Sequence, residues 1–522
     1  PDAKKKDILR LDSYQGATKD LGGYRAIDPK ALAKSELIVR IHDKKRPMPP
    51  RRAEKKLTEK ERATLTQWVR EGGSYAKHWA FIPPRKSTPP RSSEQVNNAI
   101  DLFIVDHLKE KGVTFANEAD RATLARRASL VLTGLPPEPQ QLADYLADQS
   151  PLAYEKYIDR LLASPSYGEH QTRYWLDAIR YGDTHGLHLD NRRGIYPYRD
   201  WVVRAMNKNF PLDQFLTWQL AGDLMKNPSL EQLVATGFVR MNPTTAEGGA
   251  IPAEFQAKNN FDRTETLGTV LLGMTLTCAR CHTHKYDPIP QKEYYQLFAF
   301  FNSTAEHSMD RNAYVYGPSV KAPGTVTAWN QWANLERRRQ KLMREVWDQK
   351  KAIEYANKTK WGKVSNTRSG NGFYEFDADS PQDLTMWIRY PASESPVPIP
   401  LAKGSQHVLV RYEGPHGRFR TINPWPTAKN NPVPTINALM MLADPLGPFR
   451  NTEALTLIRQ IETLEKTFTT TLVARDLQKP RKTQMLERGE YNRPKGDALR
   501  PGILSVMGTF PKDAPRNRLG LA

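Results

Sequence analysis

Cysteine is scarce in this chain, because only two of its 522 residues are cysteines. So few thiols exclude a small scaffold held together by several disulfides. Long apolar runs are missing as well: the longest, residues 267–276, contains glycine and threonine and is far shorter than the roughly 20 residues that span a membrane. The first residues include neither an initiator methionine nor an apolar signal segment. We therefore expect no transmembrane segment here, and we expect the chain to continue beyond both ends.

Acidic residues are outnumbered: 57 Asp and Glu stand against 77 Lys and Arg, which gives a formal net charge of +20. The basic residues form short, dispersed runs, and no helix-turn-helix, zinc finger or aromatic-interleaved basic motif is recognisable. Nucleic acid is therefore not an expected partner. The charge fits an acidic polysaccharide, the cell envelope or an acidic redox protein. An ordinary solvated surface explains it equally well.

Hydrophobic periodicity predicts a mainly α fold with a smaller β-rich insert. Thr58 and Glu61 form a capping-box pattern that predicts a helix over residues 58–71. One charged helix is predicted over 329–355, and alternating apolar residues over 372–425 predict strands. The expected parts are an N-terminal unit over 1–82, a linker over 83–94, a helical domain over 95–305, a helix with a β-rich insert over 306–430, and a last part over 431–522.

Both cysteines belong to one motif, Cys278-Ala279-Arg280-Cys281-His282, which follows a helix predicted over residues 262–276. This C-x-x-C-H pattern is typical of haem c attachment. Two thiols three residues apart reach the two vinyl groups of one porphyrin edge, and the adjacent imidazole of His282 becomes the proximal iron ligand. The helical domain is then a c-type haem domain. A zinc site that adds His284 is an alternative, as is an unligated or disulfide-bonded pair.

A haem iron also has a distal side, for which His185 and His188 are candidates. They lie in the segment Asp183-Thr184-His185-Gly186-Leu187-His188-Leu189-Asp190, which places two imidazoles and two carboxylates within eight residues. One interpretation is that this segment provides a distal ligand, a second metal site or an acid–base group. A hydrogen-bonded turn in a polar core is the simpler interpretation.

A second group of polar residues surrounds the start of the helix before the motif, namely Glu247, Glu254, Asp262, Arg263 and Glu265. Neighbouring carboxylates suit general acid–base chemistry or calcium binding. Acidic residues at a helix start are also ordinary capping residues, and we regard both interpretations as open.

Several stretches resemble a planctomycete cytochrome-like family. In residues 95–305 they include Leu132-Thr133-Gly134-Leu135-Pro136-Pro137, Leu161 to His170, and Cys278 to Pro290. Residues 1–82 resemble the C-terminal part of a planctomycete cytochrome c domain whose C-x-x-C-H motif is absent here, and Met48 matches the position of its axial sulfur. Residues 465–522 resemble the start of a C-terminal partner domain. The resemblance implies an extracytoplasmic location, in the periplasm or cell envelope, because haem c is attached outside the cytoplasm.

The expected function is that of an extracytoplasmic c-type cytochrome domain protein, which performs electron transfer or haem-dependent redox chemistry within a multidomain protein. The alternative is a glycan-binding or glycan-processing envelope protein in which the haem is peripheral. That alternative is motivated by the Trp- and Tyr-containing β-rich stretch and by the carboxylates near Glu247. No catalytic residue, substrate or redox partner follows from the sequence.

Overall fold

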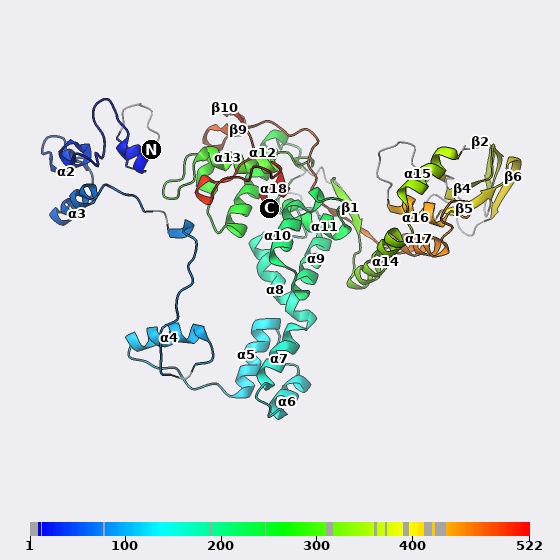
Figure 1. Cartoon of the computed structure of the whole chain (residues 1–522), viewed down its shortest axis with the longest axis horizontal. Helices are drawn as coiled ribbons and strands as arrows, with labels where there is room; N and C mark the ends of the chain where they lie inside the picture. The colour runs from blue at the N-terminus through cyan, green and yellow to red at the C-terminus, as the bar shows by residue number, and fades with distance from the viewer. Residues whose placement is uncertain are drawn as a thin grey trace. The chain divides into compact units, whose positions relative to one another are not determined.

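The computed structural model describes residues 9–11, 13–76, 79–94, 96–187, 190–245, 247–309, 317–359, 363–370, 373–389, 396–411, 420–422 and 435–522. The chain divides into two units, residues 1–116 and 117–522. Helices make up 47% of the described residues and strands 13%, and the strands form small sheets (Figure 1). The prediction of a mainly α fold with some β structure is therefore confirmed.

Within the first unit, the described residues of the range 9–76 pack short helices around a small apolar core. Its main helices are α1 (Tyr14–Thr18), α2 (Glu36–His42), α3 (Glu59–Arg70) and α4 (Ala99–Glu110), with two 3-10 turns, Leu32–Lys34 and Trp79–Phe81. The buried side chains of Ile27, Leu37, Ile41 and Val69 form the core. Thr58 caps α3 in a reciprocal capping box with Glu61, as the sequence predicts.

A helical core occupies the first part of the second unit. Aromatic side chains such as Trp201, Phe238 and Tyr294 are buried in it. Proline starts several of its helices, because the first turn has no use for the missing N–H. The helices are α5 (Arg121–Thr133), α6 (Pro139–Ala147), α7 (Ala153–Leu162), α8 (Pro165–Ala178), α9 (Tyr196–Asn207), α10 (Leu212–Ala221), α11 (Leu230–Ala235), α12 (Pro252–Thr266) and α13 (Gln291–Phe301).

A two-stranded ribbon marks where another group of elements is inserted into this core. Strand β1 (Ser319–Ala322) pairs antiparallel with β8 (Thr469–Leu472), so that Ala322 lies opposite Thr469. The intervening chain therefore leaves and returns at neighbouring points. It contains α14 (Val326–Glu345), α15 (Gln349–Lys358), α16 (Thr435–Ala443) and α17 (Thr452–Glu465).

The long charged helix predicted over 329–355 is broken in the structure. Helix α14 ends at Glu345, and α15 begins at Gln349 after the N-cap residue Asp348. The Asp348 carboxylate accepts a hydrogen bond from the Lys351 N–H, 3.1 Å away. A capping aspartate satisfies the first free N–H groups of a new helix, which explains the break.

The β-rich insert is a pair of three-stranded sheets. The strands are β2 (Lys363–Gly370), β3 (Phe373–Ser380), β4 (Leu384–Arg389), β5 (Val397–Leu401), β6 (Gly404–Arg411) and β7 (Arg420–Ile422), in the orders β2-β3-β6 and β5-β4-β7. Tyr374, Phe376 and Ile388 share their buried core. The other face of β4 packs on the helices, because Trp387 is buried in the α16–α17 cluster, and Figure 1 shows β4 next to α16.

The last residues return to the helical core. They form the hairpin β9 (Thr483–Leu486) and β10 (Pro494–Leu499), a 3-10 turn at Glu487–Gly489, another at Ser505–Met507, and α18 (Arg518–Leu521). The fully buried Arg518 guanidinium binds Asp223 at 2.7 Å and Asp476 at 3.0 Å. The five-part division of the chain stays a prediction. Among the described residues, no helix has both the length and the apolar character that crossing a bilayer requires.

Candidate functional site

The C-x-x-C-H motif lies in a short turn after α12, not directly after a helix that runs to residue 276. Helix α12 ends at Thr266 and continues as one π-helical turn, Leu267–Leu271. The chain then reverses at Gly273, whose φ is +63°, and enters the 3-10 turn Thr277–Arg280. A Cβ on Gly268 would lie 2.5 Å from Leu276 Cγ. Glycine at 268 therefore lets Leu276 pack against the helix end and fixes the approach to the motif.

Both thiols of the motif are exposed and free. The Cys281 Sγ donates a hydrogen bond to the carbonyl oxygen of Arg488, 3.1 Å away in the turn of the β9–β10 hairpin. A Cβ on Gly489 would stand 3.4 Å from the same sulfur. The hairpin thus borders one side of the motif, and the thiols of Cys278 and Cys281 are open to a reactant on the other.

The imidazole of His282 is exposed and adopts a defined orientation. Its Nδ1 lies 2.7 Å from the carbonyl oxygen of Thr283. A carbonyl only accepts, so this contact requires a proton on Nδ1, and the neutral form of the ring then offers Nε2 as a ligand atom. An imidazole that donates through one nitrogen and ligates through the other is the usual arrangement at a metal. The two thiols and His282 therefore fit a haem c group, with His282 Nε2 as the proximal donor.

His284 has a different role. Its Nδ1 accepts hydrogen bonds from the backbone N–H groups of Tyr286 and Asp287, at 3.3 and 2.8 Å. The ring therefore caps the turn that follows the motif. Within the described ranges, no three His, Cys, Asp or Glu side chains form a group that could hold a metal ion. The zinc alternative at the motif stays a prediction.

The described residues of the segment 183–190, namely 183–187 and Asp190, belong to a tight loop. An antiparallel bridge joins Thr184 and Arg192, and the Gly186 N–H donates to Asp190 Oδ1 at 2.7 Å. His185 is 2% exposed, and its carbonyl accepts from the Thr244 N–H at 3.2 Å. These contacts favour the hydrogen-bonded turn. His188 lies outside the described residues, and a distal role for either histidine stays a prediction.

The carboxylates around α12 do not share one site. Glu254 pairs with Lys258 at 2.6 Å, and Asp262 pairs with Arg180 at 2.6 Å. Burial raises the pKa of Asp262, although Arg180 opposes this shift. Glu254, Asp262 and Glu265 each pair with a different cation, so the contacts favour ordinary structural roles for these three residues over a joint acid–base or calcium site.

A buried network on the same helix has no signature in the sequence. Arg263 and Glu306 form an ion pair in which both side chains are nearly inaccessible. Arg263 also donates to Asn242 Oδ1 at 2.8 Å and to Thr304 Oγ1 at 2.9 Å. Burial alone would raise the pKa of Glu306, but Arg263 and Arg240 outweigh it and lower that pKa to about 2. The partners lie too far apart in sequence for any periodicity to reveal them.

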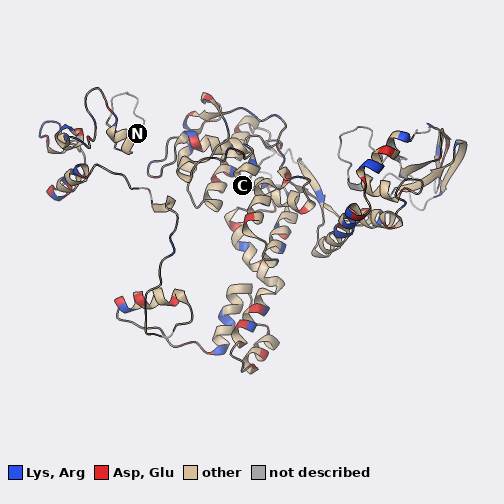
Figure 2. Cartoon of the chain, in the orientation of Figure 1, with Lys and Arg blue, Asp and Glu red and all other residues tan. Residues whose placement is uncertain are grey.

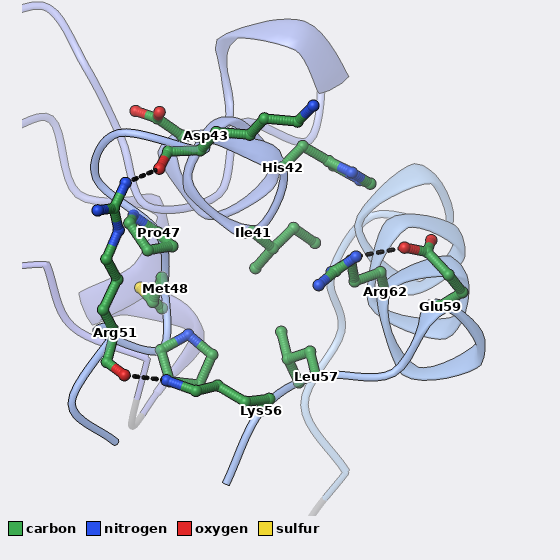
Figure 3. Close-up of a pocket in the computed structure, with 12 residues that line it drawn as sticks. Ile41, His42, Asp43, Pro47, Met48, Arg51, Lys56, Leu57, Glu59 and Arg62 are labelled. Carbon is green, nitrogen blue, oxygen red and sulfur yellow. Dashed lines mark hydrogen bonds and ion pairs between the residues drawn. The ribbon is translucent and has the colours of Figure 1, made fainter. Parts of the chain in front are cut away.

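In the first unit, Met48 lines a cavity of about 490 Å³ (Figure 3). Ile41 and Leu57 contribute apolar surface, and Arg62 pairs with Glu59 at the rim. The Arg51 guanidinium donates to the Lys44 carbonyl at 2.6 Å. The cavity thus combines a thioether, apolar walls and several cations. The role of Met48 as an axial ligand of a haem stays a prediction.

The surface charges do not gather on a single element. Figure 2 shows basic and acidic residues distributed over the helices of both units. Many are paired, as in Arg204 with Glu231 at 2.6 Å. The excess positive charge of the chain therefore does not by itself identify a partner.

Two family models match the chain. Residues 1–52 match planctomycete cytochrome C, and residues 99–306 match PSCyt2, a protein of unknown function (DUF1549). The first match includes Met48, and the second includes the whole C-x-x-C-H motif. No curated protein and no solved structure matches the chain. These two matches, in this order along the chain, agree with the family and the domain order that the sequence predicts.

Proposed function

We propose that this chain attaches haem c through Cys278 and Cys281, with His282 as proximal ligand, and carries electrons outside the cytoplasm. The observation that supports the proposal is the state of the motif: two free, exposed thiols three residues apart and an exposed imidazole whose Nδ1 lies 2.7 Å from the Thr283 carbonyl oxygen. The cytochrome family match points the same way. When bound, haem supplies an iron that exchanges single electrons.

The residues of the motif have separate tasks in this proposal. The thiols of Cys278 and Cys281 are accessible, so each can form a thioether with a vinyl group presented from solvent. The Thr283 carbonyl holds the His282 ring through Nδ1 at 2.7 Å and leaves Nε2 for the iron. Of the two residues between the thiols, Ala279 is fully buried and anchors the turn in the core.

Covalent attachment is tested by expressing the chain together with a haem c maturation system. Haem should stay with the protein on a denaturing gel, and the variant C278S/C281S should be colourless while circular dichroism shows the same helix content. Colourless, iron-free wild-type protein from this system would contradict the proposal. Spectra of the oxidised and reduced forms then separate the two uses of haem. A low-spin iron fits electron transfer, whereas a high-spin iron fits redox catalysis at an open iron.

The glycan-binding alternative has lost part of its motivation. Tyr374, Phe376 and Trp387 of the β-rich insert are buried, with exposed fractions of 3%, 0% and 0%. Buried rings offer no face on which a sugar can stack. The alternative stays a prediction, and retardation of the protein in gels that contain neutral or sulfated glycans would support it.

A further inference from the structure

We propose that Glu265 and Arg280 act as a pair of positioning residues for haem attachment, because they fix the turn that carries the two thiols. This inference rests on the proposed function and deepens it. Haem vinyl groups sit at fixed positions on a rigid ring, so both sulfurs must be presented with the correct spacing and direction. The residues between and before the cysteines determine that geometry.

Glu265, near the end of α12, receives four hydrogen bonds on one carboxylate. Its Oε1 accepts from Arg280 Nε at 3.0 Å, from Arg280 Nη2 at 2.6 Å and from the Tyr294 hydroxyl at 2.8 Å. Its Oε2 accepts from Thr277 Oγ1 at 3.1 Å. Thr277 directly precedes Cys278, and Arg280 directly precedes Cys281. One carboxylate therefore holds the residue in front of each thiol.

Arg280 is held by its side chain and by its backbone. Its guanidinium lies 4.3 Å from the ring centroid of Phe261, which is a cation–π contact with α12. Its carbonyl oxygen accepts from the Tyr295 hydroxyl at 2.9 Å and from Gln291 Nε2 at 3.1 Å, both on α13. The centre of the C-x-x-C turn is thus tied to two helices, while the thiols stay in solvent.

The chemistry of this contact favours a positioning role for Glu265. Each carboxylate oxygen has about two lone-pair sites, and three donors share Oε1 while one reaches Oε2, so the carboxylate is largely engaged by side chains of the same chain. Charge-assisted bonds that use two nitrogens of one guanidinium are strong and directional. Lysine reproduces neither the two-nitrogen contact nor the planar stacking on Phe261. Arg280→Lys is therefore expected to loosen the turn although it keeps the charge.

The buried environment of Tyr294 helps to maintain its hydrogen bond with Glu265. Burial raises the pKa of Tyr294, and the Glu265 carboxylate beside it raises that pKa further. The hydroxyl therefore stays protonated and remains a donor to Glu265 throughout the physiological pH range.

The first test uses the haem-free protein, so that its result does not depend on haem chemistry. Iodoacetamide labelling followed by peptide mass spectrometry gives the alkylation rate of each thiol. In the wild type we expect Cys281 to react more slowly than Cys278, because its Sγ donates to the Arg488 carbonyl. In Glu265→Gln and Arg280→Lys, the ratio of the two rates should change about three-fold or more, which corresponds to a difference of about 0.7 kcal/mol between the barriers.

Glu254→Gln is the matched control, because it removes a carboxylate from the same helix whose partner is only Lys258. Its rate ratio should equal that of the wild type. A merely structural role would lower the melting temperature and accelerate both thiols equally through unfolding. Equal acceleration, or an unchanged ratio in Glu265→Gln, would overturn the proposal.

The second measurement is the yield of covalent haem during expression with the maturation system. We expect a clear loss of haem in Glu265→Gln and Arg280→Lys, and wild-type yield in Glu254→Gln. If the wild type carries no covalent haem, the proposed function fails. If the wild type is loaded and Glu265→Gln is loaded equally well, only the positioning role fails.

Discussion

At the scale of single residues, the buried side chain of Glu306 depends on its ion pair with Arg263. Its carboxylate is 3% exposed and pairs with Arg263 inside the helical core. A buried ion pair contributes little relative to an apolar pair, but removing one partner leaves an uncompensated charge. The side chain therefore behaves as an essential structural group whatever the protein does.

Replacing Glu306 by Gln should destabilise the second unit by about 3–5 kcal/mol, because Arg263 would keep its charge without a counter-ion. Urea unfolding at neutral pH measures this change. The surface variant Glu254→Gln should stay within about 0.5 kcal/mol of the wild type. Equal stability of the two variants would contradict the role given to the pair.

The same group predicts a dependence on pH. The folded pKa of Glu306 is about 2, below the ordinary glutamate value of 4.5. A depressed carboxyl pKa gives stability that is present above the unfolded pKa and is lost as the pH falls through the folded pKa. Stability should thus fall between about pH 4.5 and pH 2, and this part of the slope should be missing in Glu306→Gln.

For His407 on β6, we predict a dependence of stability on pH that is opposite in sign to that of Glu306. The hydrogen bond with Asp377, 2.8 Å away, raises the pKa of His407, and Glu375 at 3.5 Å adds to the shift. A raised histidine pKa gives stability that is full below the unfolded value of about 6.5 and is lost as the pH rises through the folded pKa. Thermal unfolding of the β-rich insert above this pH should show the loss in the wild type. An identical loss in His407→Gln would contradict the assignment.

At the scale of elements, local patterns predicted structure well where the cause is local. The capping box at Thr58 and the strands of the β-rich insert follow from neighbouring residues. The end of α12 was predicted ten residues too late, because the apolar run 267–276 continues the helical pattern while glycine allows the chain to turn. Contacts such as Cys281 with Arg488, 207 residues apart, have no local signal.

Gly268 tests the importance of the turn after α12. A Cβ at this position would meet Leu276 and the carbonyl of Met274, so Gly268→Ala should cost about 1–3 kcal/mol through overpacking. It should also lower the yield of covalent haem, because Leu276 leads directly into the motif. Gly248→Ala is the control, since a Cβ there meets nothing within 4 Å. Similar melting temperatures for the two variants would contradict this explanation.

At the scale of the whole molecule, the chain consists of two units that each have their own apolar core. The sequence predicted the linker over 83–94 from its composition, and Arg85, Lys86 and Arg91 in it are exposed. The sequence could not predict that residues 469–522 return to the helical core. The buried contacts of Arg518 in this part join residues almost 300 positions apart, so they have no local signal.

Limited trypsin digestion should therefore cut first within residues 83–94. Exposed, proline-rich linkers are preferred sites of proteolysis, and Lys86 and Arg91 are both followed by serine. Mass spectrometry of the fragments should find an N-terminal piece and a stable C-terminal piece. First cleavage inside α5 to α13 would contradict the assignment of residues 83–94, which lie within the first unit, as an exposed linker.

The most direct measurement of the central claim is the intact mass of the denatured wild-type protein after expression with haem maturation. We predict a mass increased by one haem, an increase that survives denaturation and is absent from C278S/C281S. A wild-type mass equal to that of the bare polypeptide would contradict the claim, as would a haem that is lost on denaturation.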